Sequence, residues 1–155
     1  MDWQAIGSGA TALGVIFVGW QIWQTKKQNI TTFEDELSRQ YREILKTIPV
    51  KALLKEELTQ EEITRAKTGI YFYLDLCNEQ IFLRYKGRVR RSTWLDWCEG
   101  IRFNLSVPVF EKAWKEIKLQ TPESNFRGLR ELENSGFKDD PRSRYWQSLR
   151  FSFFK

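Results

Sequence analysis

The feature that most constrains this chain is an uncharged stretch near its start. No charged side chain occurs from Trp3 to Trp23, a run of 21 residues. An α-helix rises about 1.5 Å per residue, so a helix of this length is about 30 Å long and matches the hydrocarbon core of a bilayer. The stretch predicts a single transmembrane helix, and we assign residues 1–25 as a membrane anchor.

The residues at the two ends of this stretch predict its orientation. Trp3 stands at one end, and Trp20 and Trp23 stand at the other. Indole rings favour the headgroup level, and loops rich in Lys face the cytoplasm. Because Lys26 and Lys27 follow the stretch directly, we expect a single-pass protein of the inner (cytoplasmic) membrane. Its N-terminus would lie outside and its bulk in the cytoplasm.

Three alternatives to a membrane span are open. A cleaved signal peptide carries its basic residues before the apolar run, whereas here they follow it. A helix lying flat on the membrane needs a charged face, which this stretch lacks. A buried core helix would be weakened by the four glycines of the stretch, although glycine is frequent in membrane helices. These comparisons favour the membrane span.

Small residues recur on one side of the predicted span. Gly7, Ala10, Thr11 and Gly14 follow the spacing i, i+3, i+4, i+7. Small side chains let two helix backbones approach closely in lipid. The stripe predicts self-association into a homo-oligomer, and the alternative is that Gly and Ala are simply common in membrane helices.

After the span, apolar residues recur every three or four positions, as in amphipathic helices, and no alternating strand pattern occurs. One apolar stripe, from Ile30 to Ile48, continues the first helix as far as Pro49. A capping box at Thr59 opens the longest soluble helix, which Gly87 ends. Further helices are predicted to start at Ser92, Ser106 and Thr121-Pro122. The predicted fold is all-α: one N-terminal transmembrane helix that continues into a cytoplasmic bundle of about five helices, over residues 26–136.

Composition excludes several classes of protein. Charged residues make up 29% of the chain and hydrophobic residues 41%, which argues against a disordered chain or a polytopic transporter. Two cysteines are too few for a disulfide-stapled scaffold. Cys77 and Cys98 fall on apolar helical faces and should behave as small hydrophobic residues.

The same composition argues against an enzyme. Histidine is absent, which removes the commonest general base and metal ligand. No nucleotide-binding or nucleophile motif occurs, so we assign no catalytic residue, metal or cofactor. Asp75 and Glu79 lie one helical turn apart and are expected to pair with arginines of neighbouring helices. The remaining exception is an enzyme that acts on lipid at the membrane surface through these two carboxylates.

The densest charge feature consists of five cations around Gly87: Arg84, Lys86, Arg88, Arg90 and Arg91. Arginine suits bidentate contacts with phosphate, so anionic lipid headgroups or a nucleotide are candidate partners. The net charge of +5 is modest and makes nucleic acid an unlikely partner. The alternative is a solvated connection between helices, neutralised by acids such as Asp96 or Glu99.

Aromatic residues gather in two places. Trp94, Trp97 and Trp114 are expected to pack in the core. Residues 137–155 form a basic, aromatic C-terminal tail that includes Arg142, Arg144, Tyr145, Trp146, Arg150, Phe151, Phe153, Phe154 and Lys155. This tail is predicted either to pack on the bundle or to dock on a partner or a membrane surface.

Several of these features occur together in one order along the chain. They are the uncharged N-terminal helix, Gln21-Ile22-Trp23-Gln24-Thr25-Lys26-Lys27, Gly87…Ser92-x-Trp94-x-x-Trp97 and Pro108-x-Phe110-x-x-x-Trp114. The chain resembles small single-pass bacterial membrane proteins of unassigned function. This resemblance implies one membrane helix plus a cytoplasmic helical domain, and it brings no catalytic residues.

Two functions are therefore expected. The first is a membrane-anchored cytoplasmic interaction module that self-associates and whose partner the sequence does not name. The alternative is a ligand-gated membrane effector whose bundle binds an anionic ligand through Arg84–Arg91.

Overall fold

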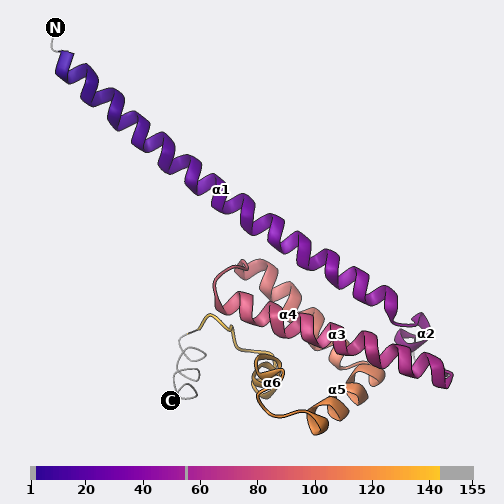
Figure 1. Ribbon diagram of the computed structural model, residues 1–155. Coiled ribbons are helices and arrows are strands. Elements are labelled where there is room, and N and C mark those ends of the chain that lie inside the picture. Colours follow the sequence, from indigo (N-terminus) through magenta and orange to yellow (C-terminus); the bar gives the residue numbers. More distant parts are fainter. Residues whose placement is uncertain (1–2, 55, 144–155) are drawn as a thin grey trace. The chain divides into compact units, whose positions relative to one another are not determined.

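The computed structural model describes residues 3–54 and 56–143, and of residues 3–16 and 19 it describes the backbone alone. The helices of this part are α1 (Trp3–Thr47), α2 (Val50–Leu53), α3 (Gln60–Tyr85), α4 (Arg91–Leu105), α5 (Pro108–Gln120) and α6 (Arg127–Asn134). No strand occurs among these described residues (Figure 1). The predicted all-α class is therefore confirmed.

The chain divides into two compact units, Met1–Asp35 and Glu36–Lys155. The predicted anchor, residues 1–25, lies within the first unit. In the described part of the chain, no helix combines the length and the apolar character that crossing a bilayer requires. The structure thus confirms the all-α class but not the predicted transmembrane helix. The side chains of residues 3–16, which make up most of that predicted helix, lie outside the described residues.

The central helix of the second unit is α3, on which α4, α5 and α6 all pack (Figure 1). Its buried side chains recur at the predicted spacing of three and four and include Ala66, Ile70, Tyr73, Leu74, Cys77 and Ile81. The other helices bury Trp94, Ile101, Phe110, Trp114, Leu129 and Leu132 in the core. Burial of this apolar surface is the main force that holds the bundle together.

The C-terminal part of α1 belongs to this unit and packs closely on α3. Leu37 and Ile48 are buried. A Cβ atom at Gly69 of α3 would come within 2.7 Å of both the Thr47 Oγ1 and the Ile48 Cγ1 atoms. Only glycine leaves room at this position for the side chains of Thr47 and Ile48. Helix α1 ends at Thr47, directly before the segment containing Pro49, as predicted.

Two helix boundaries follow the predicted local signals. At the start of α3, the Thr59 hydroxyl accepts a hydrogen bond from the Glu62 backbone N–H at 3.3 Å, and the Glu62 carboxylate accepts one from the Thr59 N–H at 2.8 Å. At its end, Gly87 has a φ of 71°, the left-handed conformation that glycine adopts without strain. The N–H groups of Gly87 and Arg88 donate to carbonyl groups of the last turn. The predicted capping box and glycine stop are confirmed.

Three predicted helix starts are wrong. The residue before α4 is Arg90 instead of Ser92, α5 follows Val107 instead of Ser106, and α6 begins at Arg127, after a turn that follows Thr121-Pro122. None of these starts has a side-chain cap from its own N-cap residue. Packing sets the start of α6 instead.

At that start, Phe126 has a φ of 54°, and its ring lies edge-on to the rings of Tyr71 and Trp114, at centroid distances of 5.5 and 5.8 Å. The Asn78 Oδ1 atom of α3 accepts a hydrogen bond from the Leu129 N–H at 3.3 Å. Helix α6 is therefore capped by a different helix.

Candidate functional site

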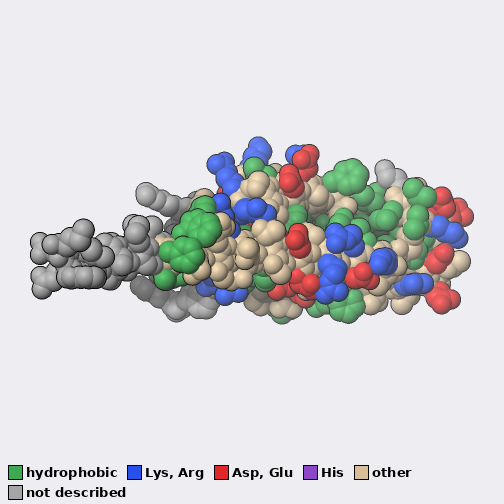
Figure 2. Space-filling model, turned by 90° about the horizontal axis from the view of Figure 1, so that it is seen from above, with side chains coloured by type: hydrophobic (Ala, Val, Ile, Leu, Met, Phe, Trp, Pro, Cys, Tyr) green, Lys and Arg blue, Asp and Glu red, His purple; other side chains and the backbone are tan. Residues whose placement is uncertain are grey.

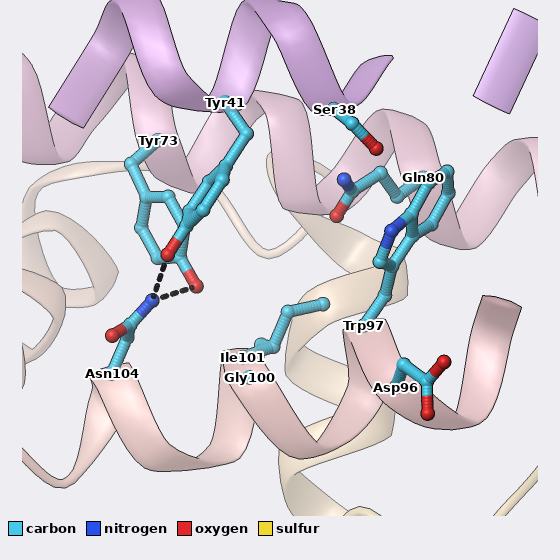
Figure 3. Close-up of a pocket in the computed structure, with 9 residues that line it drawn as sticks. All are labelled: Ser38, Tyr41, Tyr73, Gln80, Asp96, Trp97, Gly100, Ile101 and Asn104. Atoms are coloured by element: carbon cyan, nitrogen blue, oxygen red, sulfur yellow. Dashed lines mark hydrogen bonds between the residues drawn. The ribbon is translucent and has the colours of Figure 1, made fainter. Parts of the chain in front are cut away.

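Three helices of the second unit enclose a small pocket with a volume of about 130 Å³ (Figure 3). Its lining residues are Ser38 and Tyr41 from α1, Tyr73 and Gln80 from α3, and Asp96, Trp97, Gly100, Ile101 and Asn104 from α4. Because α3 and α4 pack on one another, the positions of these side chains are fixed by the core beneath them. None of these residues was predicted as a site, although Asp96 and Trp97 were noted for other roles.

A hydrogen-bonded triad forms one end of the pocket. The Asn104 Nδ2 group donates to the Tyr73 Oη atom at 2.9 Å and to the Tyr41 Oη atom at 3.4 Å (Figure 3). Burial raises the pKa of Tyr73, so its phenol is neutral at physiological pH. The Asn104 Oδ1 atom has no hydrogen-bond partner among the described residues. The triad joins three helices, and Figure 3 shows the Asn104 Oδ1 atom on the side away from Gln80 and Trp97.

At the opposite end lies a buried amide. Gln80 is only 5% exposed, and Figure 3 shows its amide between Ser38 and Trp97. The amide has no hydrogen-bond partner among the described residues. Every polar side-chain atom of this part that is fully enclosed does have such a partner. The Gln80 amide must therefore meet its partner in the open space of the pocket, since buried polar groups are nearly always hydrogen-bonded.

The pocket carries one formal charge, and it is negative. Asp96 is exposed at the rim, below Trp97 in the view of Figure 3. It forms no ion pair with any described residue. No Lys or Arg belongs to the lining. An occupant would thus meet a carboxylate, amide groups and aromatic rings, and this chemistry does not favour an anion.

The predicted basic cluster is separated by the structure. Arg84 is buried, and its Nε and Nη2 groups donate to the Asp140 carboxylate at 2.9 and 2.5 Å. Its Nη1 group donates to the Val89 carbonyl at 2.8 Å. Arg84 therefore fastens the 84–91 loop and the segment around Asp140 to the end of α3. Its guanidinium is already fully engaged and is not available to a ligand.

The acid in this pair has a shifted pKa. Burial alone would raise the pKa of Asp140, but the hydrogen bonds from Arg84 and from the Arg142 N–H outweigh this effect. The pKa of Asp140 therefore lies below its ordinary value, and the pair is ionised at neutral pH.

The other four members of the cluster are exposed: Lys86, Arg88, Arg90 and Arg91. The Lys86 ammonium lies 5.4 Å from the ring centre of Phe82. None of the four lines the pocket described above. On the face seen in Figure 2, basic and acidic side chains are interspersed. The spacing of Arg84 from Cys77 and Ile81, seven and three residues, is the sequence signal that places it on the buried stripe of α3.

The predicted membrane-interface residues are exposed where the structure describes them. Trp20 and Trp23 are each 52% exposed, and Lys26 and Lys27 are exposed as well. The Lys27 ammonium lies 3.9 Å above the Trp23 ring centre, a cation–π contact. The structure does not describe the side chain of Trp3. Nor does it describe the side chains of the predicted self-association stripe, Gly7, Ala10, Thr11 and Gly14.

The remaining candidate groups are the carboxylates Asp75 and Glu79 and the thiols of Cys77 and Cys98. Asp75 and Glu79 are exposed and form no ion pair with any described residue, so their pairing with arginines stays a prediction. No metal-binding group of side chains occurs in the described part of the chain. Cys77 and Cys98 are buried, as predicted. Burial raises the pKa of Cys77 to about 12 and also raises that of Cys98.

Trp94 and Trp114 are buried as predicted, whereas Trp97 is half-exposed at the pocket. The first part of the predicted tail packs on the bundle, since Pro141 is fully buried and Asp140 binds Arg84. Residues 144–155, including Trp146, lie outside the described residues.

No protein-family model matches this chain, and neither a curated protein nor a solved structure is significantly similar to it. The resemblance to small single-pass bacterial membrane proteins therefore stays a prediction, and the candidate functions depend on the residues themselves.

Proposed function

We propose that this protein is a membrane-anchored helical interaction module that self-associates. The N-terminal part of α1 is the anchor, and the helical unit from Glu36 onward is the module that binds a partner. The observation that carries this proposal is the exposure of large apolar side chains on the first unit.

These apolar side chains follow one another along α1. They are at least half exposed in every case: Phe17, Val18, Trp20, Ile22 and Trp23. Figure 2 shows hydrophobic side chains beside the grey atoms of the N-terminal segment. A contiguous apolar surface that a chain does not cover itself is typical of contact with lipid or with another protein. The absence of charge from Trp3 to Trp23 favours lipid.

The flanking residues support the orientation in this proposal. Lys26 and Lys27 are exposed directly after the apolar stretch, where they would reach the phosphate level of the cytoplasmic leaflet. Each such cation contributes roughly 1 kcal/mol to the attraction for anionic lipid. Trp20 and Trp23 would lie at the headgroup level of the same leaflet.

The test of the anchor is retention of the full chain in membranes. Leu13→Arg places a charge in the middle of the uncharged stretch, where Arg costs about 3 kcal/mol on insertion. We expect the natural chain to stay in the membrane pellet after a carbonate wash and the Leu13→Arg chain to be released. The control, Gln28→Arg, adds the same charge to an exposed position beyond the stretch and should stay in the pellet.

Recovery of the natural chain in the supernatant after lysis without detergent would overturn the anchor. Equal retention of Leu13→Arg and Gln28→Arg would do so as well, because a surface-bound protein does not respond to charge at the centre of the stretch.

Self-association is tested by substitutions on two sides of the same helix. The backbone of residues 3–16 is helical, so Gly9 lies on the side opposite to the stripe that contains Gly14. We expect Gly14→Leu to reduce crosslinked dimers in membranes and Gly9→Leu to leave them unchanged. An equal response of the two variants contradicts the stripe as the contact.

The alternative function, an effector that binds an anionic ligand through Arg84–Arg91, has less support. The buried ion pair of Arg84 with Asp140 removes the first member of that cluster, so the exposed cations Lys86, Arg88 and Arg91 would have to bind the ligand from the surface.

A further inference from the structure

The pocket between α1, α3 and α4 contains polar groups that the protein itself leaves unused. The Gln80 amide has no hydrogen-bond partner among the described residues, although Gln80 is only 5% exposed. Because every fully enclosed polar side-chain atom of the described part has a partner, the Gln80 amide is reached from the open space of the pocket. An occupant of the pocket can therefore take the place of water as the hydrogen-bond partner of this amide.

The size of the pocket limits what can occupy it. Its volume is about 130 Å³, and a cavity of about 150 Å³ holds one benzene molecule. A single ring therefore nearly fills the pocket, and a larger molecule fits only by extending through its open side. A nucleotide is far too large.

The charge of the lining determines the sign of the occupant. Asp96 is the only charged lining residue, and no described cation neutralises it. The Coulomb attraction between Asp96 and a cation is modest at a partly hydrated rim. No lining residue opposes it, because none carries a positive charge.

The aromatic lining favours the same sign. Figure 3 shows the rings of Tyr41 and Tyr73 on one side of the pocket and the Trp97 indole on the other. The faces of such rings attract cations, and indole does so most strongly. Ile101 lies between these two sides in the same view.

We propose that this pocket binds a small, planar organic cation of the amidinium or guanidinium type. Its N–H groups donate to the Gln80 Oε1 atom, its charge is attracted by Asp96 at the rim, and its plane lies near the Trp97 ring. This site is separate from the membrane anchor and from the Arg84–Arg91 loop, so it stands if either of those proposals fails.

The test uses three probes that share size and shape but differ in charge: benzamidine, benzamide and benzoate. The full-length protein carries ¹⁵N-labelled tryptophan, and the Trp97 indole N–H signal is identified by its loss in Trp97→Phe. We expect benzamidine to shift this signal saturably. Benzamide should bind at least ten-fold more weakly, and benzoate should give no saturable shift.

Two substitutions locate the binding groups. Asp96→Asn removes the charge from an exposed side chain and therefore does not threaten the fold; we expect it to weaken benzamidine binding at least five-fold. Gln80→Leu removes the amide at similar volume and should weaken binding further. The matched control is Glu99→Gln, which removes an acid from an exposed position of α4 outside the pocket lining and should leave binding unchanged.

Three results would overturn the proposal. The first is the absence of a saturable shift with benzamidine, which would mean that the pocket holds water alone. The second is equal binding of all three probes, which indicates adhesion to apolar surface. The third is an unchanged affinity in Asp96→Asn. Because the readout is a signal from Trp97, none of these results depends on whether the chain is retained in membranes.

Discussion

Arg84 donates three hydrogen bonds from a position where only 5% of its surface is exposed. A buried guanidinium is stable only when its donors and its charge are satisfied. Asp140, from a segment 56 residues further along the chain, supplies the counter-charge and accepts two of the three hydrogen bonds, and the Val89 carbonyl accepts the third. The pair therefore holds the residues after α6 against the end of α3.

Removal of the acid should be costly. Asp140→Ala leaves the Arg84 guanidinium buried without its counter-ion, and we expect the free energy of unfolding to fall by about 2 to 3 kcal/mol. Urea denaturation at pH 7 measures this change. The neighbouring Asp139→Ala, which removes an acid that has no described partner, is the control and should change the free energy of unfolding by less than about 0.5 kcal/mol. Equal effects of the two substitutions would show that the pair contributes no specific stability.

The sequence identified Arg84 as a cation in a dense cluster, but it did not identify Asp140 as its partner. Local spacing can place Arg84 on the buried stripe of α3, because Cys77 and Ile81 occupy the same stripe. The choice among the chain's acids depends on how the segment after α6 folds back, and no local pattern encodes this.

At the scale of helices, two glycines in helix interiors have opposite surroundings. A Cβ atom at Gly69 would meet the side chains of Thr47 and Ile48 at 2.7 Å, whereas a Cβ atom at Gly100 would meet nothing within 4 Å. We expect Gly69→Ala to lower the melting temperature by forcing α1 and α3 apart. Gly100→Ala should raise it, because alanine stabilises a helix by about 0.5 to 1 kcal/mol relative to glycine.

Circular dichroism melting curves of the full chain measure both changes. If Gly69→Ala were as stabilising as Gly100→Ala, the close approach of α1 to α3 would be wrong.

The start of α6 depends on a residue of α3. Asn78 accepts a hydrogen bond from the Leu129 N–H, as an N-cap residue normally does from within its own helix. Asn78→Ala should therefore lower the free energy of unfolding by about 1 kcal/mol, measured by urea denaturation. Asn134→Ala, the same change at an exposed helical position, should be neutral or slightly stabilising, and a similar loss in both variants would contradict the capping role.

These helices show which boundaries a sequence can predict. The start and end of α3 were predicted because Thr59, Glu62 and Gly87 satisfy backbone groups of their own helix. The starts of α4, α5 and α6 were misplaced because the serine and threonine signals nearby compete with burial of large rings, above all that of Phe126. Tertiary packing overrides a cap that stabilises by only about 1 kcal/mol.

At the scale of the whole molecule, stability in acid depends on carboxylates with lowered pKa values. The hydrogen bonds described above hold the pKa of Asp140 below its ordinary value of 3.8. The hydrogen bond from the Thr59 N–H lowers that of Glu62 below 4.5. A group whose pKa is lowered on folding stabilises the fold fully above its ordinary pKa, and this contribution is lost as the pH falls through the lower folded value.

The stability difference between the natural chain and Asp140→Asn should therefore be constant from neutral pH down to about pH 5 and shrink below pH 4. Urea denaturation at several pH values between 7 and 2.5 measures this difference. A difference that stays constant over the whole range would mean that the Asp140 pKa is the same in the folded and unfolded chain.

The pocket could not be predicted from the sequence, because it forms only when whole helices pack on one another. Its buried amide, that of Gln80, lies on α3, whereas Asp96 and Trp97 lie on α4, 16 and 17 residues further along the sequence. Each residue on its own is typical of an amphipathic helix. Only the packing of α4 on α3 and α1 brings them together, and that arrangement depends on the shapes of core side chains such as Tyr73 and Ile101.

The burial of Cys77 and Cys98 has a practical consequence. Thiols react with maleimides as thiolates, and both native thiols are enclosed and protonated at neutral pH. A cysteine introduced at an open surface position would be alkylated far faster than either of them. A single fluorophore or spin label can thus be attached to the otherwise natural polypeptide, without first replacing its own sulfhydryl groups.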